Sequence, residues 1–147
     1  MRKLNNVEAI EKYLRKIDCI IKKKGREILK DYNITGPQFN ALQYLIREGN
    51  LTIGEISERL ALAYSTITDL VDRMEKNGLV VRVRDDKDRR VVRIKVLDKG
   101  FEILQKVLNR RIDYLEKMLS SFTEEEKQSL VKSLEKLYIA MEREGEL

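Results

Sequence analysis

The 147-residue sequence predicts a mainly α-helical fold with one short β-hairpin. Apolar residues recur every three or four positions through most of the chain, which is the period of an amphipathic helix. Near residue 80 the period becomes two, with valines and an isoleucine alternating with Arg and Lys, which indicates strands. Three sequences of the form Thr-x-x-Gln or Thr-x-x-Glu add capping boxes that can open helices.

The first helix is predicted over residues 6–32, and Asn33 ends it. Its apolar residues form a narrow stripe of Val7, Ile10, Leu14, Ile17, Ile21 and Ile28. A stripe of this kind suits contact with a partner helix. Thr35 and Gln38 then form a capping box for the second helix, with Pro37 in the first turn, where its missing N–H costs little.

The second helix is predicted to stop at residues 49–50, and Thr52 and Glu55 form the capping box of the third. A tight turn at residues 61–63 leads to a fourth helix, which the Asn-Gly pair at residues 77–78 ends. Two short helices joined in this way can present the second one to a DNA major groove. The segment therefore predicts a helix-turn-helix that binds DNA.

Two strands follow, and each is predicted to have one basic face. The alternating residues are Val81, Arg82, Val83 and Arg84 in the first strand and Val92, Arg93, Ile94, Lys95 and Val96 in the second. A polar loop at residues 85–90 joins them. Residues 82–95 hold seven basic and three acidic residues, a net charge of +4. Such a hairpin beside a helix-turn-helix can reach a phosphate backbone or a minor groove.

Asp98 is predicted to cap a long fifth helix, and Thr123 and Glu126 form the capping box of a sixth. The fifth helix carries Phe101, Leu104, Leu108, Ile112, Leu115, Leu119 and Phe122. The sixth carries Leu130, Leu134, Leu137 and Met141. Together with the first helix, these apolar faces look too long for the central residues alone to bury.

We therefore expect the terminal helices to form a homodimer. Residues 1–34 and 98–147 are the expected helical dimerisation region, and residues 35–97 are the DNA-binding region of the same continuous structural unit. The expected dimer contacts are Val7, Ile10, Leu14, Ile17, Leu115, Leu119, Phe122, Leu130, Leu134, Leu137 and Met141.

The composition argues against catalysis. With no His and one Cys, the chain cannot assemble a Ser-His-Asp or Cys-His site or a typical transition-metal cage, and it has no Gly-rich phosphate loop. We therefore expect no enzyme activity, no cofactor and no metal. No apolar run approaches the ~20 residues that span a membrane, and residues 1–6 lack the apolar block of a signal peptide. These features indicate a cytoplasmic protein.

Three segments resemble the MarR (multiple antibiotic resistance regulator) family of winged helix-turn-helix transcription factors. The first is Thr35-x-x-Gln38-Phe39-x-x-Leu42 at the opening of the second helix. The second runs from Thr66 to Val80 through the end of the fourth helix. The third is Asp88-x-Arg90, followed by Leu97 and Gly100. The three occur in the family's order and spacing, and the resemblance covers nearly the whole chain.

The resemblance implies a DNA interface on the fourth helix and the wing. Base edges are expected near Ser65, Thr66, Thr68 and Asp69, and phosphates near Tyr64 and Arg73. Arg90 is expected in the minor groove, where a guanidinium gains from the narrow channel of A·T-rich DNA, with Asp88 orienting it. Further backbone candidates are Arg82, Arg84, Arg89 and Arg93. Without the helix-turn-helix, the same charges would indicate a solvated hairpin with internal Asp–Arg pairs.

Residues 54–78 hold five acidic and three basic residues, so the wing is expected to supply most of the phosphate attraction, and Asp72 is expected to pair within the protein. Three positions depart from the family pattern. Ala63 stands where relatives commonly have a capping Ser, a loss of about 1 kcal/mol. Asp69 occupies a position that is often basic, so the operator sequence is not transferable. Asp98 replaces the usual Thr.

Many members of this family bind phenolic or aromatic carboxylates in a crevice between the dimerisation helices and the DNA-binding lobe. The resemblance suggests Lys16, Cys19, Gly36 and Arg90 as effector-binding candidates. Lys16 can supply a cation there or be an ordinary surface charge. Gly36 stands where some members carry an aromatic hydroxyl. Cys19 matches a helix on which some relatives sense peroxide, but we expect it to be packed among apolar residues, where a thiol is inert.

The expected function is thus that of a dimeric, sequence-specific DNA-binding repressor that a small ligand releases from DNA. Three alternatives remain open. The protein can be an architectural DNA binder that tolerates many sequences, a one-Cys redox-responsive regulator through Cys19, or a protein-interaction module built from its terminal helices.

Overall fold

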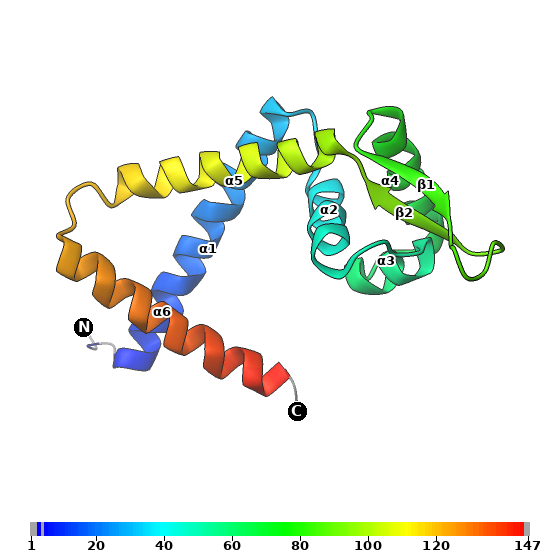
Figure 1. The fold of residues 1–147 in the computed structure, drawn as a ribbon. Coiled ribbons are helices and arrows are strands. Elements are labelled where there is room, and N and C mark those ends of the chain that lie inside the picture. Colours follow the sequence, from blue (N-terminus) through cyan, green and yellow to red (C-terminus); the bar gives the residue numbers. More distant parts are fainter. Residues whose placement is uncertain (1–2, 4, 146–147) are drawn as a thin grey trace. The chain divides into compact units, whose positions relative to one another are not determined.

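A computed structural model describes residue 3 and residues 5–145, and in that part of the chain six helices accompany one two-stranded sheet (Figure 1). In chain order they are α1 (Asn6–Asp31), α2 (Gly36–Glu48), α3 (Ile53–Leu60), α4 (Tyr64–Lys76), β1 (Val80–Arg84), β2 (Val92–Val96), α5 (Asp98–Met118) and α6 (Glu124–Gly145). The mainly helical fold with a β wing is therefore confirmed. The chain forms two compact units, which meet at residues 111 and 112 within α5.

All three predicted capping boxes form, at the starts of α2, α3 and α6. In each, a threonine hydroxyl accepts from the backbone N–H three residues later, and that residue's side chain accepts from the threonine N–H. The pairs are Thr35 with Gln38, Thr52 with Glu55 and Thr123 with Glu126, with distances of 3.1–3.3 Å. Asp98 is different, because it is the first residue of α5 and the Leu97 carbonyl accepts the opening bond from Phe101, at 3.3 Å. The helix also ends at Met118 rather than Phe122.

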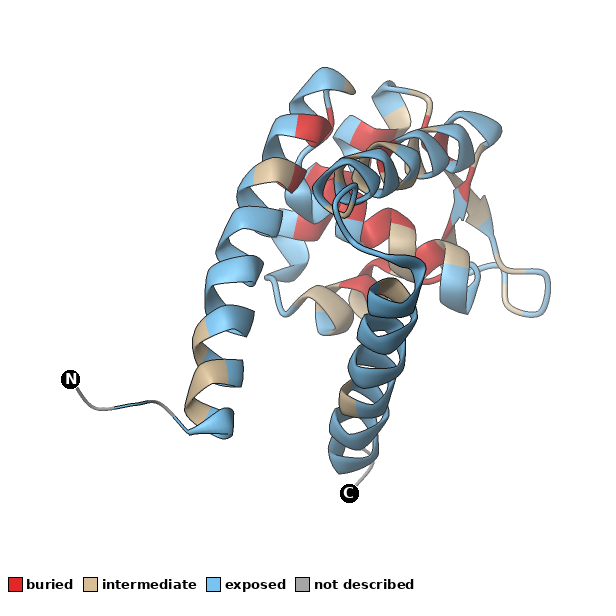
Figure 2. Ribbon diagram, turned by 90° about the vertical axis from the view of Figure 1, so that its left-hand side faces the viewer, coloured by how far each residue is buried: buried red, intermediate tan, exposed pale blue. Residues whose placement is uncertain are grey.

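The core of the first unit lies among α2, α3, α4 and the sheet. Its most enclosed side chains include Phe39 of α2, Ile56 of α3, Met74 of α4 and Ile94 of β2, none of them more than 2% exposed. Burial of such side chains contributes about 1.5–3 kcal/mol each. In Figure 2 the buried residues gather in this part of the molecule. The helix-turn-helix and the hairpin therefore share one core.

α5 begins in close contact with the sheet, and this explains Gly100. A Cβ at Gly100 would lie 2.7 Å from the Leu79 carbonyl oxygen and 2.7 Å from a Val96 methyl carbon, closer than Cβ atoms approach. The Leu97 N–H also donates to that same Leu79 carbonyl, at 2.9 Å. Glycine at this position lets the chain leave the sheet directly into the helix.

The strand register places the basic residues of the wing on both faces of the sheet. We use "wing" for β1, β2 and the loop at residues 85–91. Arg82 lies opposite Ile94, and Val83 lies opposite Arg93. Directly opposed residues share a face in an antiparallel pair. Arg82 and Arg84 therefore share the inner face with buried Ile94, whereas Arg93 and Lys95 lie on the outer face. The predicted basic face of each strand exists, but the two do not form one surface.

The terminal helices leave apolar side chains exposed. On α1, Val7, Ile10, Leu14 and Ile17 are exposed, and α6 has no buried residue in its described length (Figure 2). Of the other predicted dimer contacts, Leu115, Phe122, Leu130, Leu134 and Met141 are exposed and Leu119 and Leu137 are half-buried. Cys19 is exposed as well, so the prediction of a packed, apolar environment is wrong for the single chain.

Within the described residues, none of the helices has the length and apolar character needed to cross a membrane. The same part of the chain contains no group of three or more acidic or Cys side chains arranged to hold a metal ion. Residues 1, 2 and 4, which belong to the N-terminal segment discussed above, lie outside the described residues.

Candidate nucleic-acid interface

α4 has one apolar face and one exposed polar face. Its buried stripe consists of Ile67, Leu70, Val71 and Met74. Most of the predicted DNA contacts lie on the other side of the helix and are exposed: Tyr64, Ser65, Thr66, Asp69 and Arg73. Thr68 is half-buried, and its hydroxyl donates to the Tyr64 carbonyl, at 3.1 Å. Because the stripe fixes the helix on the core, the polar face is held outward.

The turn before α4 contains two unusual alanines. Ala61 ends α3 with φ 54° and ψ 42°, a left-handed conformation that costs an L-residue roughly 1–2 kcal/mol. Ala63 precedes α4 in an extended conformation and supplies no side-chain acceptor, as its sequence position predicts. The first N–H groups of α4 therefore lack a side-chain cap.

At the wing tip, Asp88 and Arg90 form a two-pronged ion pair. Arg90 donates from Nε to Asp88 Oδ1 and from Nη2 to Oδ2, both at 3.1 Å, and its backbone N–H also donates to Oδ1. The hydrogen bonds from Arg90 lower the pKa of Asp88. The Arg90 side chain is nevertheless 91% exposed. The guanidinium is thus oriented and still accessible.

The loop behind that tip is held by polar contacts. Asp85 Oδ2 accepts the backbone N–H groups of Lys87 and Asp88, at 3.1 and 3.0 Å. Arg84 donates to the Arg89 carbonyl, at 2.8 Å. Within the described part of the chain, Lys87 and Arg89 make no ion pair, and both are exposed. Lys87 was not among the DNA contacts predicted from the sequence, although it is an exposed cation of the same basic hairpin.

Arg82 is held against α4 by ion pairs. Its guanidinium contacts Asp72 Oδ1 at 2.6 Å and Glu75 Oε1 at 2.7 Å, and its side chain is 28% exposed. The Arg82 backbone N–H also donates to Glu75, at 3.0 Å, and this bond is the main reason that the pKa of Glu75 is lowered. The internal pairing predicted for Asp72 is confirmed.

Arg93 is engaged on the other face of the wing. It contacts Asp85 Oδ1 at 2.7 Å and Glu55 Oε1 at 3.2 Å, and it donates to the Asn50 carbonyl at 3.1 Å. The hydrogen bond from Arg93 is the largest cause of the lowered pKa of Asp85. For Glu55 the pKa is lowered first by the Thr52 backbone N–H and then by the Thr52 hydroxyl and Arg93. Arg82 and Arg93 are thus partly buried, and each has two carboxylate partners. Arg73, Arg89 and Arg90 are exposed.

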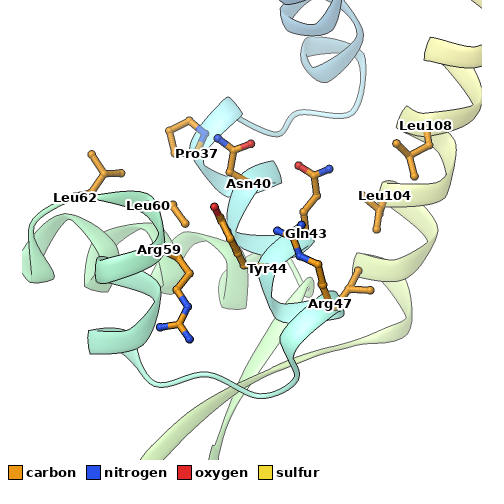
Figure 3. Close-up of a pocket in the computed structure, with 11 residues that line it drawn as sticks. Pro37, Asn40, Gln43, Tyr44, Arg47, Arg59, Leu60, Leu62, Leu104 and Leu108 are labelled. Carbon is orange, nitrogen blue, oxygen red and sulfur yellow. The ribbon is translucent and has the colours of Figure 1, made fainter. Parts of the chain in front are cut away.

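A cavity of about 740 Å³ lies beside the helix-turn-helix, within the first unit. Figure 3 shows α2 side chains lying between α3 residues and the α5 leucines. The apolar part of the lining is Pro37, Ile46, Leu60, Leu62, Leu104 and Leu108, and the polar part is Asn40, Gln43, Tyr44, Arg47 and Arg59. Arg47 lies over the Tyr44 ring at 4.9 Å. The effector candidates Lys16, Cys19, Gly36 and Arg90 do not line this cavity.

Comparisons with known proteins agree with this architecture. The family model described as "MarR family" matches residues 32–91. YsmB of Bacillus subtilis (strain 168), an HTH-type transcriptional regulator, is 55% identical over 140 residues, which covers 95% of this chain and 96% of that protein. MdtR of the same organism, an HTH-type transcriptional repressor, is 34% identical over 100 residues, which covers 68% of this chain and 64% of MdtR.

Solved structures of other proteins share this fold. A MarR family protein from Bacillus stearothermophilus is 50% identical, with a TM-score of 0.82 over 95% of this chain and 99% of that one. A mutant of MepR from S. aureus, bound to an oligodeoxyribonucleotide, shares the fold at 23% identity, with a TM-score of 0.72 over 90% of this chain and 97% of that one.

Proposed function

Because the chain belongs to the MarR family of DNA-binding transcriptional regulators, which are not enzymes, we propose that it acts as a homodimeric, sequence-specific repressor that a small ligand releases from DNA. The observation that carries the proposal is the shared core of α4 and the wing. That core packs α4 against the wing strands, so the polar face of α4 and the exposed Arg90 guanidinium belong to one packed unit. A helix for the major groove and a cation for the minor groove are thus presented together.

In the proposed complex, α4 reads the bases and the wing attracts the backbone. Ser65, Thr66 and Thr68 offer hydroxyls that can donate or accept, and Asp69 can accept from cytosine N4. Tyr64 and Arg73, at the borders of that face, contact phosphates. Arg90 enters the minor groove, with Asp88 orienting it and Arg84 and Arg89 near the backbone. α4 itself carries three acidic and two basic residues, which suits discrimination of bases more than attraction to phosphate.

Selection of DNA from a random pool by the full chain tests the proposal. A repressor of this kind enriches a pseudo-palindrome with half-sites about one turn apart, ~34 Å. The selected site should then bind roughly 10³-fold or more tightly than shuffled DNA of the same length at the same salt concentration. Equal affinities would support the architectural alternative, and the absence of any enriched DNA would favour the protein-interaction module.

The exposed stripe of α1 supports dimerisation. Val7, Ile10, Leu14 and Ile17 recur along one side of the helix, and single exposed apolar residues need no explanation whereas a continuous stripe does. Sedimentation of the wild-type chain should give twice the mass of one chain, and Leu14→Glu should give one. Lys23→Glu, a charge change of the same helix outside the stripe, is the control and should stay dimeric.

The cavity in the first unit supports control by a ligand. It combines leucines from α3 and α5 with the guanidinium group of Arg47, so it suits a small molecule with an apolar body and an anionic group. Arg59 also lines it, but its guanidinium is paired with Glu48 at 3.0 Å. MdtR is named as a transcriptional repressor, which supports repression rather than activation for this chain. Salicylate, used as the probe, should release the wild-type protein from its selected DNA. Leu104→Trp, which fills the cavity, should bind DNA and resist release, and equal release of both proteins would contradict this assignment.

A further inference from the structure

The sequence pattern assigns Arg93 to the DNA backbone, but its surroundings differ from those of the other wing arginines. Arg93 lies on the outer face of the sheet, opposite Val83. Its guanidinium has two carboxylate partners, Asp85 at 2.7 Å and Glu55 at 3.2 Å, and its side chain is 33% exposed. A phosphate approaching this group would meet a cluster whose formal charge is −1. Arg90, by contrast, has one carboxylate partner and is 91% exposed.

The partners of Arg93 belong to separate parts of the DNA-binding unit. Glu55 is in the first turn of α3, where it completes the capping box with Thr52. The Asn50 carbonyl, which also accepts from Arg93, precedes that helix. Asp85 begins the wing loop. Arg93 therefore joins β2 to the start of the helix-turn-helix and to the base of the wing loop.

Asp85 extends this connection to the wing tip. While its Oδ1 faces Arg93, its Oδ2 accepts the backbone N–H groups of Lys87 and Asp88. Asp88 in turn holds Arg90 through two side-chain contacts of 3.1 Å. A continuous series of polar contacts thus runs from α3 through Arg93 and the loop to the guanidinium expected in the minor groove.

We propose that Arg93 is a positioning residue that fixes the wing against α3, so that Arg90 is aimed at DNA, and that it makes no phosphate contact of its own. Glu55 and Asp85 are its partners in this role. The proposal rests on the DNA-binding function proposed above. It assigns different roles to two wing arginines, positioning to Arg93 and DNA contact to Arg90, whereas the sequence pattern makes both of them DNA contacts.

The direction in which Asp85→Asn changes the DNA affinity distinguishes a positioning role of Arg93 from a phosphate contact. Asparagine can still accept the loop N–H groups, so the turn is retained while the charge that holds Arg93 is removed. If Arg93 contacted phosphate, freeing it and deleting a nearby negative charge would strengthen DNA binding. A positioning role predicts that Asp85→Asn weakens binding to the selected DNA by about tenfold at fixed salt, ~1.4 kcal/mol in binding free energy. Unchanged or tighter binding would overturn the proposal.

A double-mutant cycle supplies the second test. Arg93→Gln should weaken DNA binding in the wild-type background and add little once Arg90→Ala is present, because both changes remove the same contact. Arg89→Gln is the matched control, and its effect should add to that of Arg90→Ala. Full additivity of Arg93→Gln with Arg90→Ala would contradict the positioning role.

Hydrogen exchange without DNA gives a readout of the wing itself. Arg93→Gln should speed the exchange of the amides at residues 87–91, whereas Arg89→Gln should not, and unchanged exchange in Arg93→Gln would count against the proposal. Arg93→Lys, which keeps the charge, serves if the glutamine variant fails to fold, and it should show the same loss to a smaller degree. Failure of the wild-type chain to bind any DNA would refute the proposed function instead, so the two failures are distinguishable.

Discussion

The helix α4 and the wing loop are held in place by different forces. α4 packs four buried apolar side chains against the core, whereas the wing loop at residues 85–91 is held by ion pairs and backbone hydrogen bonds. Apolar burial depends little on moderate salt or on pH, whereas contacts between exposed charges weaken as the salt concentration rises and as the carboxylates become protonated in acid. α4, which we propose to distinguish bases, is therefore the member whose attachment depends less on the solution conditions. The wing loop is the member whose contacts should respond to the salt concentration and to the pH.

The largest expected effect concerns the apolar attachment of α4. Met74→Ala removes a fully buried side chain and should lower the free energy of unfolding by about 2–5 kcal/mol, because the cavity that it leaves cannot fully collapse. Val83→Ala in the half-buried wing strand should cost well under half as much. Urea unfolding monitored by circular dichroism measures both, and equal costs would remove the contrast between the two regions.

The next effect concerns the exposed tip of the wing. Arg90→Ala should weaken binding to the selected DNA tenfold or more while leaving the unfolding midpoint unchanged, since the side chain is 91% exposed. Lys106→Ala, at an exposed position of α5, is the control. A titration at fixed salt in which Arg90→Ala binds as tightly as the wild type would refute the assignment of the tip to DNA.

A smaller effect is expected at the uncapped start of α4. Ala63→Ser supplies the missing acceptor for a free N–H group and should raise the free energy of unfolding by about 1 kcal/mol. Thermal unfolding of the two proteins measures the difference. Destabilisation by serine would mean that the first turn of α4 is already satisfied in another way.

The smallest effect is a loosening of the wing in acid. Asp85, Asp88 and Glu55 have pKa values below their ordinary ones because of hydrogen bonds from Arg93, Arg90 and the Thr52 N–H respectively. A carboxyl group whose pKa is lower in the folded state than in the unfolded state stabilises the fold at pH values above its unfolded pKa. That stabilisation is lost as the pH falls through the pKa of the folded state. Wing amides should therefore lose hydrogen-exchange protection below about pH 4, before those of α4. Simultaneous loss in both regions would contradict the comparison.

The sequence was sufficient to predict features that depend on near neighbours. The three capping boxes join residues three positions apart, and the helices follow from apolar residues at helical spacing, so both are encoded locally. The change to a period of two located the hairpin. The helical period of the apolar residues likewise predicted which face of α4 is polar. Asp98 was placed one position wrong, because the residue that opens α5 is decided by the contact of the chain with Leu79 and the sheet.

Contacts between distant residues required the tertiary structure. Arg93 and Glu55 are 38 residues apart, and Arg82 and Asp72 are 10 apart, so spacing gave no sign that these arginines are engaged. The strand register decides which face each basic side chain occupies, and it put Arg82 and Arg93 on opposite sides of the wing. The cavity is likewise formed by α2, α3 and α5, which meet only after folding. The sequence determined where the charges stand along the chain, and folding decided which of them stay free, because an ion pair depends on distance in space.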